Sequence, residues 1–517
     1  MTKDYFLPVV SKAAVNSFTL IDWDLAAGKI DLNQATTYKI YALFQSPLLP
    51  TQYLSDVPLS SDSSGALYST LSNWGQLNAN TQQTLTDFLT PQVITSSGSS
   101  GPQTIYGRRV VGCDLLQSKV TTHFIIWYSG IDPRCASGVT DVYVANLATG
   151  FEDAWTKYYT LGYTEPVTTN VYLVPLIKRI TNADAISWPL GIFFDHDLSD
   201  NILNLQAIAA HEFFHQVQLQ YFAASCPKYP LGAPWNIVGA WVDNEDVRWW
   251  MDSTAQWAQH EVYTSDKSYF RPIPSFLNQT WQHLDTRLIF INVDPKGLAG
   301  FPYGTVLFPI YLSERLPAQG TLIKNTWEKY SQLNNGCGAM MPALQSALQT
   351  QGTSMELVFP GFSEANYSLA YQNQNDFRND PTFGVGASYK PWTEIAALWE
   401  DLLFQHGPTT GTGRDTVEHL GTAYIELDNR FSNGIGRALT VTADIYLSSS
   451  LTTTVDPVVK VWAINQYTPT IISKTIIPNF QFITQTGSTK HYVAKAGVPG
   501  FDGSKWVTMM LVNTQTS

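Results

Sequence analysis

The chain has 517 residues and a formal net charge of −12, and its residues are 44% hydrophobic but only 14% charged. This length predicts two or three folded domains. An acidic chain without a cluster of Lys and Arg disfavours nucleic-acid binding and docking on anionic membranes. No apolar run approaches the ~20 residues that a membrane-spanning helix needs, so no membrane span is expected.

The N-terminus and the cysteines bear on the compartment of the protein. Residues 1–10 contain one Lys, an early Asp and a very short apolar run, which makes a poor secretory signal peptide. Either a signal has been removed, or the protein stays inside the cell or is exported by another route. The cysteines, Cys113, Cys135, Cys226 and Cys337, form no Cys-x-x-Cys motif, which disfavours a thiolate zinc site. One or two disulfides and buried thiols both fit this number.

The first ninety residues are predicted to be mainly helical. Apolar residues at helical spacing predict helices over 20–27, 31–44 and 71–89. The Ser- and Gly-rich stretch 95–102 then has the composition of a linker. It is interpreted either as the boundary of an N-terminal region, 1–104, that serves as a propeptide or cover, or as an ordinary surface loop.

After this stretch the pattern becomes that of an α+β fold. β-branched and aromatic runs predict strands, and amphipathic stripes predict helices between them. The predicted strands are 120–128, 169–175 and 188–195, and the predicted helices are 141–159 and 204–221.

The last hundred residues change again, to a pattern of alternating apolar residues separated by turns. This pattern predicts a small all-β sandwich. Its strands are expected over 422–427, 438–447, 458–464, 491–494 and 506–512. The chain is therefore expected to divide into an N-terminal helical region at 1–104, an α+β domain at 105–410 and a β-sandwich domain at 411–517.

The sequence His-Glu-x-x-His occurs within the predicted helix 204–221. Positions four apart lie on one face of a helix, so His211 and His215 can offer two imidazole nitrogens to one metal ion. Glu212 lies one step around the helix, where a carboxylate can act on a metal-activated water. This combination of residues is typical of a catalytic zinc site, which takes three protein ligands and one water.

The third ligand is expected on a later helix. The Trp-rich segment 249–261 has a helical pattern, and the residues that could reach a metal are Asp252, His260, Glu261 and, just upstream, Glu245. Its three tryptophans, Trp249, Trp250 and Trp257, fit either a wall of a substrate site or packing in a core.

Three segments together resemble a known family. Residues 209–218, the Trp-rich helix 249–261 and residues 301–315 are similar to a family of bacterial secreted zinc metalloproteases of the gluzincin class. These proteins are relatives of the thermolysin-like and immune-inhibitor peptidases. The likeness spans roughly residues 20–325, and a β-sandwich often follows in the family. The resemblance implies a zincin-like metalloprotease core, a bound Zn²⁺ and an extracellular location.

The family also suggests the third ligand. Its second helix carries Glu-Gly-Thr-Ala-x-Trp-x-Glu, in which the first Glu binds zinc. The corresponding positions in this chain are Asp252 and, for the second Glu, Gln259. The resemblance therefore makes Asp252 the expected third ligand, with Glu261 and Glu245 as alternatives. The carboxylate lost at Gln259 is a plausible partner for a metal-bound histidine.

The resemblance implies a zinc-dependent endopeptidase acting on protein or peptide substrates, with Glu212 as general base. Tyr303 is the candidate for stabilising the oxyanion, although a packing tyrosine at a helix start is an alternative interpretation. A second hypothesis is a catalytically degenerate scaffold with a structural, self-assembling, toxin or binding role. The low charge, the high Thr, Asn and Gln content and the poor signal peptide favour this second hypothesis.

Overall fold

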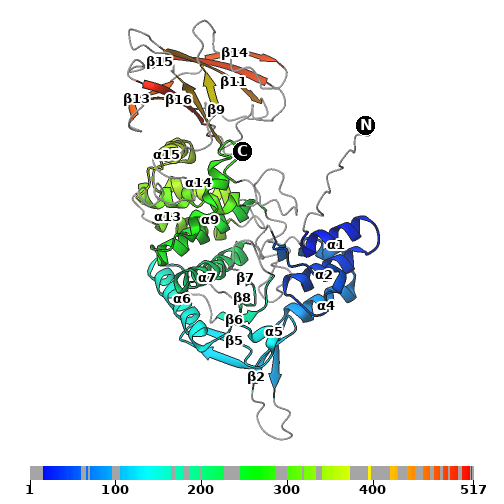
Figure 1. The fold of residues 1–517 in the computed structure, drawn as a ribbon. Coiled ribbons are helices and arrows are strands. Elements are labelled where there is room, and N and C mark those ends of the chain that lie inside the picture. The colour runs from blue at the N-terminus through cyan, green and yellow to red at the C-terminus, as the bar shows by residue number, and fades with distance from the viewer. Residues whose placement is uncertain are drawn as a thin grey trace, which may run out of the picture. The chain divides into compact units, whose positions relative to one another are not determined.

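The structure of this protein is a computed structural model, and it describes most of the chain. The described residues are 15–59, 66–67, 70–95, 105–164, 169–177, 185–196, 201–225, 245–285, 300–316, 320–333, 340–372, 394–397, 420–428, 439–448, 458–465, 471–477, 481–486, 489–498, 504–512 and 514. Within them helices and strands mix along the chain, which confirms the predicted α+β class (Figure 1).

The chain divides into two compact units. The first comprises Met1–Asn244, Ala258–Asp266 and Ile289–Pro295, and the second comprises Glu245–Trp257, Lys267–Leu288 and Lys296–Ser517. The boundary passes through one helix, α9 (Glu245–Val262). It falls inside the predicted domain 105–410, and the division into three domains stays a prediction.

The N-terminal part of the first unit is helical, as predicted. Its elements are α1 (Ser17–Ala26), α2 (Leu32–Leu43), η1 (Thr51–Tyr53), η2 (Trp74–Gln76) and α4 (Ala79–Leu89). Each α-helix begins at a polar cap. Asn16 and Asn78 accept from the backbone three residues ahead, and Asp31 forms a reciprocal capping box with Gln34. These caps set where the three helices start.

A three-stranded antiparallel sheet follows, in the order β1-β2-β3. Its strands are β1 (Gln92–Thr95), β2 (Ile105–Val110) and β3 (Cys113–Leu115). Gln92 lies opposite Arg109, so β1 and β2 pair across the predicted linker. Residues 96–102 of that linker lie outside the described residues. The pairing of its two flanking strands supports the interpretation as a loop within one sheet.

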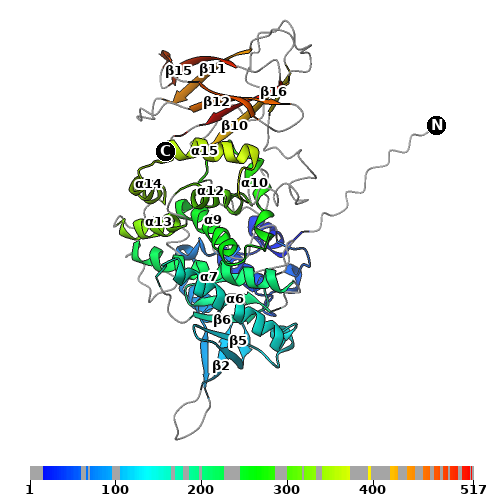
Figure 2. The ribbon, with the colours of Figure 1, turned by 90° about the vertical axis from the view of Figure 1, so that its left-hand side faces the viewer.

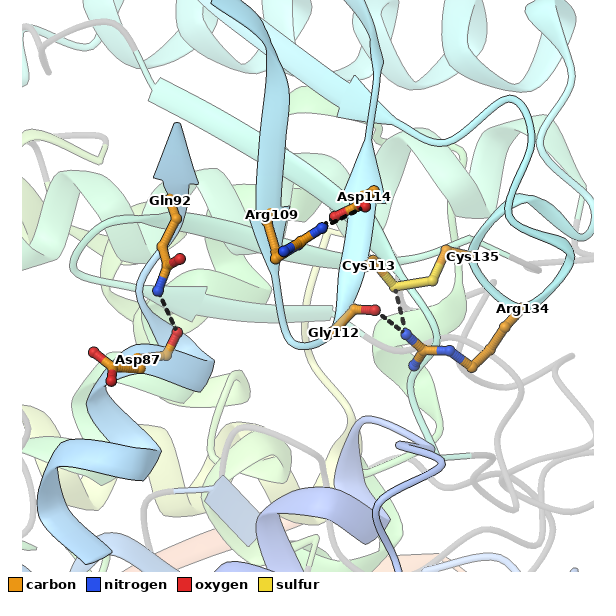
Figure 3. Close-up of polar contacts among 8 residues, drawn as sticks. All are labelled: Asp87, Gln92, Arg109, Gly112, Cys113, Asp114, Arg134 and Cys135. Carbon is orange, nitrogen blue, oxygen red and sulfur yellow. Dashed lines mark hydrogen bonds and ion pairs between the residues drawn. A yellow bond between two sulfur atoms is a disulfide. The ribbon is translucent and has the colours of Figure 1, made fainter. Parts of the chain in front are cut away.

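A disulfide joins this small sheet to a short helix, α5 (Pro133–Ala136). Cys113 and Cys135 are both fully buried, with their Cα atoms 6.0 Å apart. Figure 3 shows Arg134 beside the bridge, where its Nη2 donates to the carbonyl oxygen of Gly112 and lies 3.5 Å from the Cys113 sulfur. Of the two interpretations left open, disulfides and buried thiols, the disulfide holds for Cys113 and Cys135. Cys226 and Cys337 lie outside the described residues.

The first unit is built around a five-stranded sheet in the order β4-β5-β6-β8-β7. Its strands are β4 (Gln117–Val120), β5 (Phe124–Tyr128), β6 (Thr169–Val174), β7 (Ala185–Trp188) and β8 (Gly191–Asp195). The three central strands are parallel, and the two edge strands run antiparallel to their neighbours. Two predicted strands are wrong in one respect, because each crosses the connection of an antiparallel pair. The predicted strand 120–128 covers residues 121–123 between β4 and β5, and the predicted strand 188–195 covers the turn at 189–190 between β7 and β8.

Two long helices accompany this sheet, α6 (Asp141–Thr160) and α7 (Ile202–Ser225), and both were predicted. They lie side by side (Figures 1 and 2). Gly150 permits their approach, since a Cβ there would come 2.8 Å from the Cα of Gln206 on α7. Phe213 of α7 packs edge-on against Phe124 of β5, with ring centroids 4.8 Å apart. Apolar packing therefore holds α7 on both α6 and the sheet.

The second unit begins with helices. They are the first turns of α9 and then η3 (Ser268–Phe270), α10 (Ile273–Leu277), α11 (Phe301–Gly304), α12 (Leu307–Arg315), α13 (Thr321–Gln332), α14 (Met340–Thr350) and α15 (Met355–Ser368). Trp249, Trp250 and Trp257 are fully buried, which supports core packing for these side chains. Trp257 donates its indole N–H to Ser313 of α12.

The C-terminal part of the second unit contains two sheets. One has the order β13-β12-β16-β10-β9 and the other β11-β15-β14. The strands are β9 (Glu394–Ala397), β10 (Thr422–Asp428), β11 (Leu439–Ser448), β12 (Val458–Asn465), β13 (Ile471–Ile477), β14 (Gln481–Thr486), β15 (Thr489–Val498) and β16 (Ser504–Val512). The five predicted strands are confirmed, and β9, β13 and β14 are additional. No helix within the described ranges is long and apolar enough to cross a membrane.

Candidate metal site

The predicted motif lies on α7, near the middle of a 24-residue helix. His211, Glu212 and His215 have exposed fractions of 7%, 6% and 5%. The prediction that the motif is helical is confirmed. Burial of three polar side chains on one helix is costly unless they contact polar partners, which makes their contacts informative.

The two histidines face each other. Their Nε2 atoms are 3.2 Å apart, and the rings are nearly perpendicular with centroids at 4.8 Å. Zinc binds imidazole nitrogen at about 2.0–2.1 Å in tetrahedral geometry, which places two such nitrogens roughly 3.3 to 3.4 Å apart. The observed separation lies within about 0.2 Å of that requirement. The pair therefore fits as two ligands of one zinc ion.

Gln218, which was not predicted as a site residue, contacts the second histidine. His215 Nδ1 lies 2.7 Å from Oε1 of Gln218, whose side chain is fully buried. The signal was present in the sequence, because Gln218 follows His215 by three positions and so lies on the same face of the helix.

Hydrogen bonds from two neighbouring elements hold the motif in place. The hydroxyl of Tyr158 on α6 donates to the carbonyl oxygen of Ala210, at 2.8 Å. Complete burial raises the pKa of Tyr158 well above its ordinary value. On another side, Gln216 Nε2 donates to the carbonyl oxygen of Trp188 at 3.0 Å and reaches Ser187, which ties α7 to the β7–β8 hairpin.

Three of the other predicted site residues, Asp252, Tyr303 and Glu245, belong to the second unit. Asp252 lies on α9 and Tyr303 on α11, and both are half-buried. Glu245 is the first residue of α9. Among the residues that the structure describes, no group of three or more His, Cys, Asp or Glu side chains is gathered around a common point. Asp252 as third ligand and Tyr303 as oxyanion donor stay predictions.

The last turn of α9 belongs to the first unit and has structural contacts there. Glu261, an alternative third ligand, forms an ion pair with Lys157 of α6 at 3.1 Å. Gln259 donates its side-chain N–H to a carboxylate oxygen of Asp266 at 2.7 Å. Burial lowers the pKa of His260, which favours its neutral form. Glu261 as an alternative third ligand stays a prediction.

The chain was also compared with known proteins. No protein-family model and no curated protein matches it. The resemblance to gluzincin peptidases therefore rests on the residues described above.

Proposed function

We propose that this protein is a zinc-dependent endopeptidase. In this proposal His211 and His215 hold the zinc ion, and Asp252 supplies the third ligand. The observation that carries the proposal is the pair of buried Nε2 atoms, 3.2 Å apart, on the same helix as Glu212. Such a pair next to a carboxylate suits metal-assisted hydrolysis of a peptide bond.

When bound, zinc supplies Lewis acidity, which polarises a peptide carbonyl and makes water a stronger nucleophile at neutral pH. Glu212 takes the proton of the attacking water and then delivers it to the leaving amine. Tyr303 donates a hydrogen bond to the oxyanion that develops on the carbonyl.

The proposal includes a zincin-like core, a C-terminal β-sandwich and an extracellular location. Contacts of β12 and β13 with β15 support the sandwich. The Cys113–Cys135 disulfide supports a location outside the reducing cytosol, since stable disulfides form in oxidising compartments.

Metal analysis of protein purified without added zinc tests the proposal. We expect one equivalent of zinc in the wild type and in the control His123→Ala, and none in His215→Ala or Asp252→Ala. His123 is the matched control because it contacts Glu152 in the same unit. A wild-type protein without zinc would refute the proposal and favour the hypothesis of a degenerate scaffold with a binding or structural role.

Glu212→Gln separates catalysis from metal binding. The amide cannot accept the proton of water, so we expect full zinc content and a loss of peptide cleavage of roughly 100-fold or more. Cleavage equal to that of the wild type would exclude Glu212 as general base.

A further inference from the structure

Three polar side chains form a continuous line along α7. His211, His215 and Gln218 are separated by four and three positions, so they lie on one face of the helix. Nε2 of His211 lies 3.2 Å from Nε2 of His215. Nδ1 of His215 lies 2.7 Å from Oε1 of Gln218. All three side chains are buried.

The contact with Gln218 bears on the tautomer of His215. A neutral imidazole carries its single proton on one ring nitrogen, and an amide oxygen can only accept. The oxygen of Gln218 therefore places the proton on Nδ1 of His215 and leaves a lone pair on Nε2. That nitrogen is the one directed at His211.

We propose that Gln218 is a positioning residue that prepares His215 to bind metal through Nε2. This inference rests on the proposed zinc site. Histidines that bind metals commonly donate their other N–H to a carboxylate, a carbonyl or water, which fixes both the tautomer and the ring orientation. Here the partner is a neutral amide on the same helix, three residues further on. The opposite amide orientation would require the proton on Nε2, which would block that nitrogen from the metal.

The neutral charge of the Gln218 amide affects how strongly His215 would bind zinc. A carboxylate at position 218 would add negative charge next to His215 and make the ring a stronger donor to zinc. An amide orients the ring without that charge. Gln218→Glu should therefore bind zinc at least as tightly as the wild type, whereas Gln218→Met, which has no acceptor of comparable strength, should bind it about 10- to 100-fold more weakly.

The test combines zinc affinity, measured by competition with a chromophoric chelator, with nitrogen NMR of ¹⁵N-histidine-labelled protein. The full chain is used throughout. Gln220→Met makes the same change five positions from His215, off that face of the helix, and serves as the control. We expect wild-type zinc affinity in Gln220→Met and reduced affinity in Gln218→Met only. In metal-free protein, we expect His215 to carry its proton on Nδ1 in the wild type and to lose that preference in Gln218→Met.

The outcomes separate this inference from the proposed function. If the wild type binds zinc and Gln218→Met binds it equally well, the role of Gln218 is overturned and the zinc site stands. A loss of affinity in Gln218→Glu as large as in Gln218→Met would also overturn it, because Glu retains the acceptor. If the wild type binds no zinc, the proposed function fails and the NMR signals decide the role of Gln218. An unchanged His215 tautomer in Gln218→Met would then overturn that role.

Discussion

At the scale of single residues, several polar side chains of the first unit are buried in contact with one another. His215 contacts both His211 and Gln218, and Gln259 contacts Asp266. A buried polar group costs free energy unless it is hydrogen-bonded, so such contacts are expected wherever polar side chains leave water. The same requirement means that replacing one member affects its partner as well.

A half-buried pair in the first unit, Glu152 and His123, is expected to make the stability of that unit depend on pH. Glu152 of α6 accepts from the backbone N–H of His123 at 3.0 Å and contacts its Nδ1 at 2.7 Å. Burial raises the pKa of Glu152, but hydrogen bonds from Thr121 and His123 outweigh it, so the net pKa lies below the ordinary 4.5. A carboxyl group with a lowered folded-state pKa contributes stability above its unfolded pKa, and that stability is lost as the pH falls through the folded pKa.

We therefore expect Glu152→Gln to lower the free energy of unfolding at pH 7, by an amount that shrinks as the pH falls below about 4.5. Urea unfolding of both proteins at pH 7 and at a series of pH values below about 4.5 measures this difference. A difference that stays constant over the whole range would show that the Glu152 carboxylate does not carry the effect.

At the scale of elements, the Cys113–Cys135 bridge closes a segment of the chain that contains β4 and β5. Its ends are 22 positions apart, in β3 and α5. Closing a loop of this length removes conformational freedom from the unfolded chain, which is worth about 3 kcal/mol. Because this entropy is removed from the unfolded chain, the bridge stabilises the folded first unit, which includes β4 at the edge of the five-stranded sheet.

We expect the double variant Cys113→Ser/Cys135→Ser to lose about 3 kcal/mol of stability in the first unit. Thermal unfolding followed by calorimetry measures this loss. A reductant should produce a similar loss in the wild type and none in the double variant. Equal melting of the wild type and the double variant without reductant would contradict a stabilising role for the bridge.

At the scale of the whole molecule, the proposed zinc ion links binding to stability. A ligand that binds only the folded state stabilises it by about 2.7 kcal/mol at a free concentration one hundred times its dissociation constant. The histidine pair lies on α7, which contacts α6, β7 and β8 in the first unit. Zinc bound there should stabilise that unit.

We expect a strong chelator to lower the melting temperature of the wild type, and excess zinc to restore it. The His215→Ala variant should melt at the same temperature with and without chelator. A chelator effect of equal size in both proteins would place the stabilising metal away from His215.

The longer helices of the first unit, α9 and the helical motif followed from the sequence because their information is local, whereas α13, α14 and α15 were not predicted. The apolar stripe of α6 and the spacing of His211 and His215 repeat with the helical period. The cap at Asn16 was not used, and the first helix was predicted to begin at 20 although α1 begins at Ser17. The strands β10, β11, β12, β15 and β16 were also found from their alternation. The turn between β7 and β8 was missed, because one apolar run covers the end of β7 and all of β8.

The sequence by itself determined the α+β class, the main helices and the likeness of its motif to a zinc site, since each depends on residues that are close along the chain. Only the tertiary structure decided that β1 pairs with β2 across the Ser- and Gly-rich stretch and that Cys113 bridges to Cys135. It also decided that the Nε2 atoms of His211 and His215 lie 3.2 Å apart and that Gln218 contacts Nδ1 of His215. These features depend on strand pairing, on side-chain rotamers and on burial, which are set by packing between distant segments and not by the local pattern.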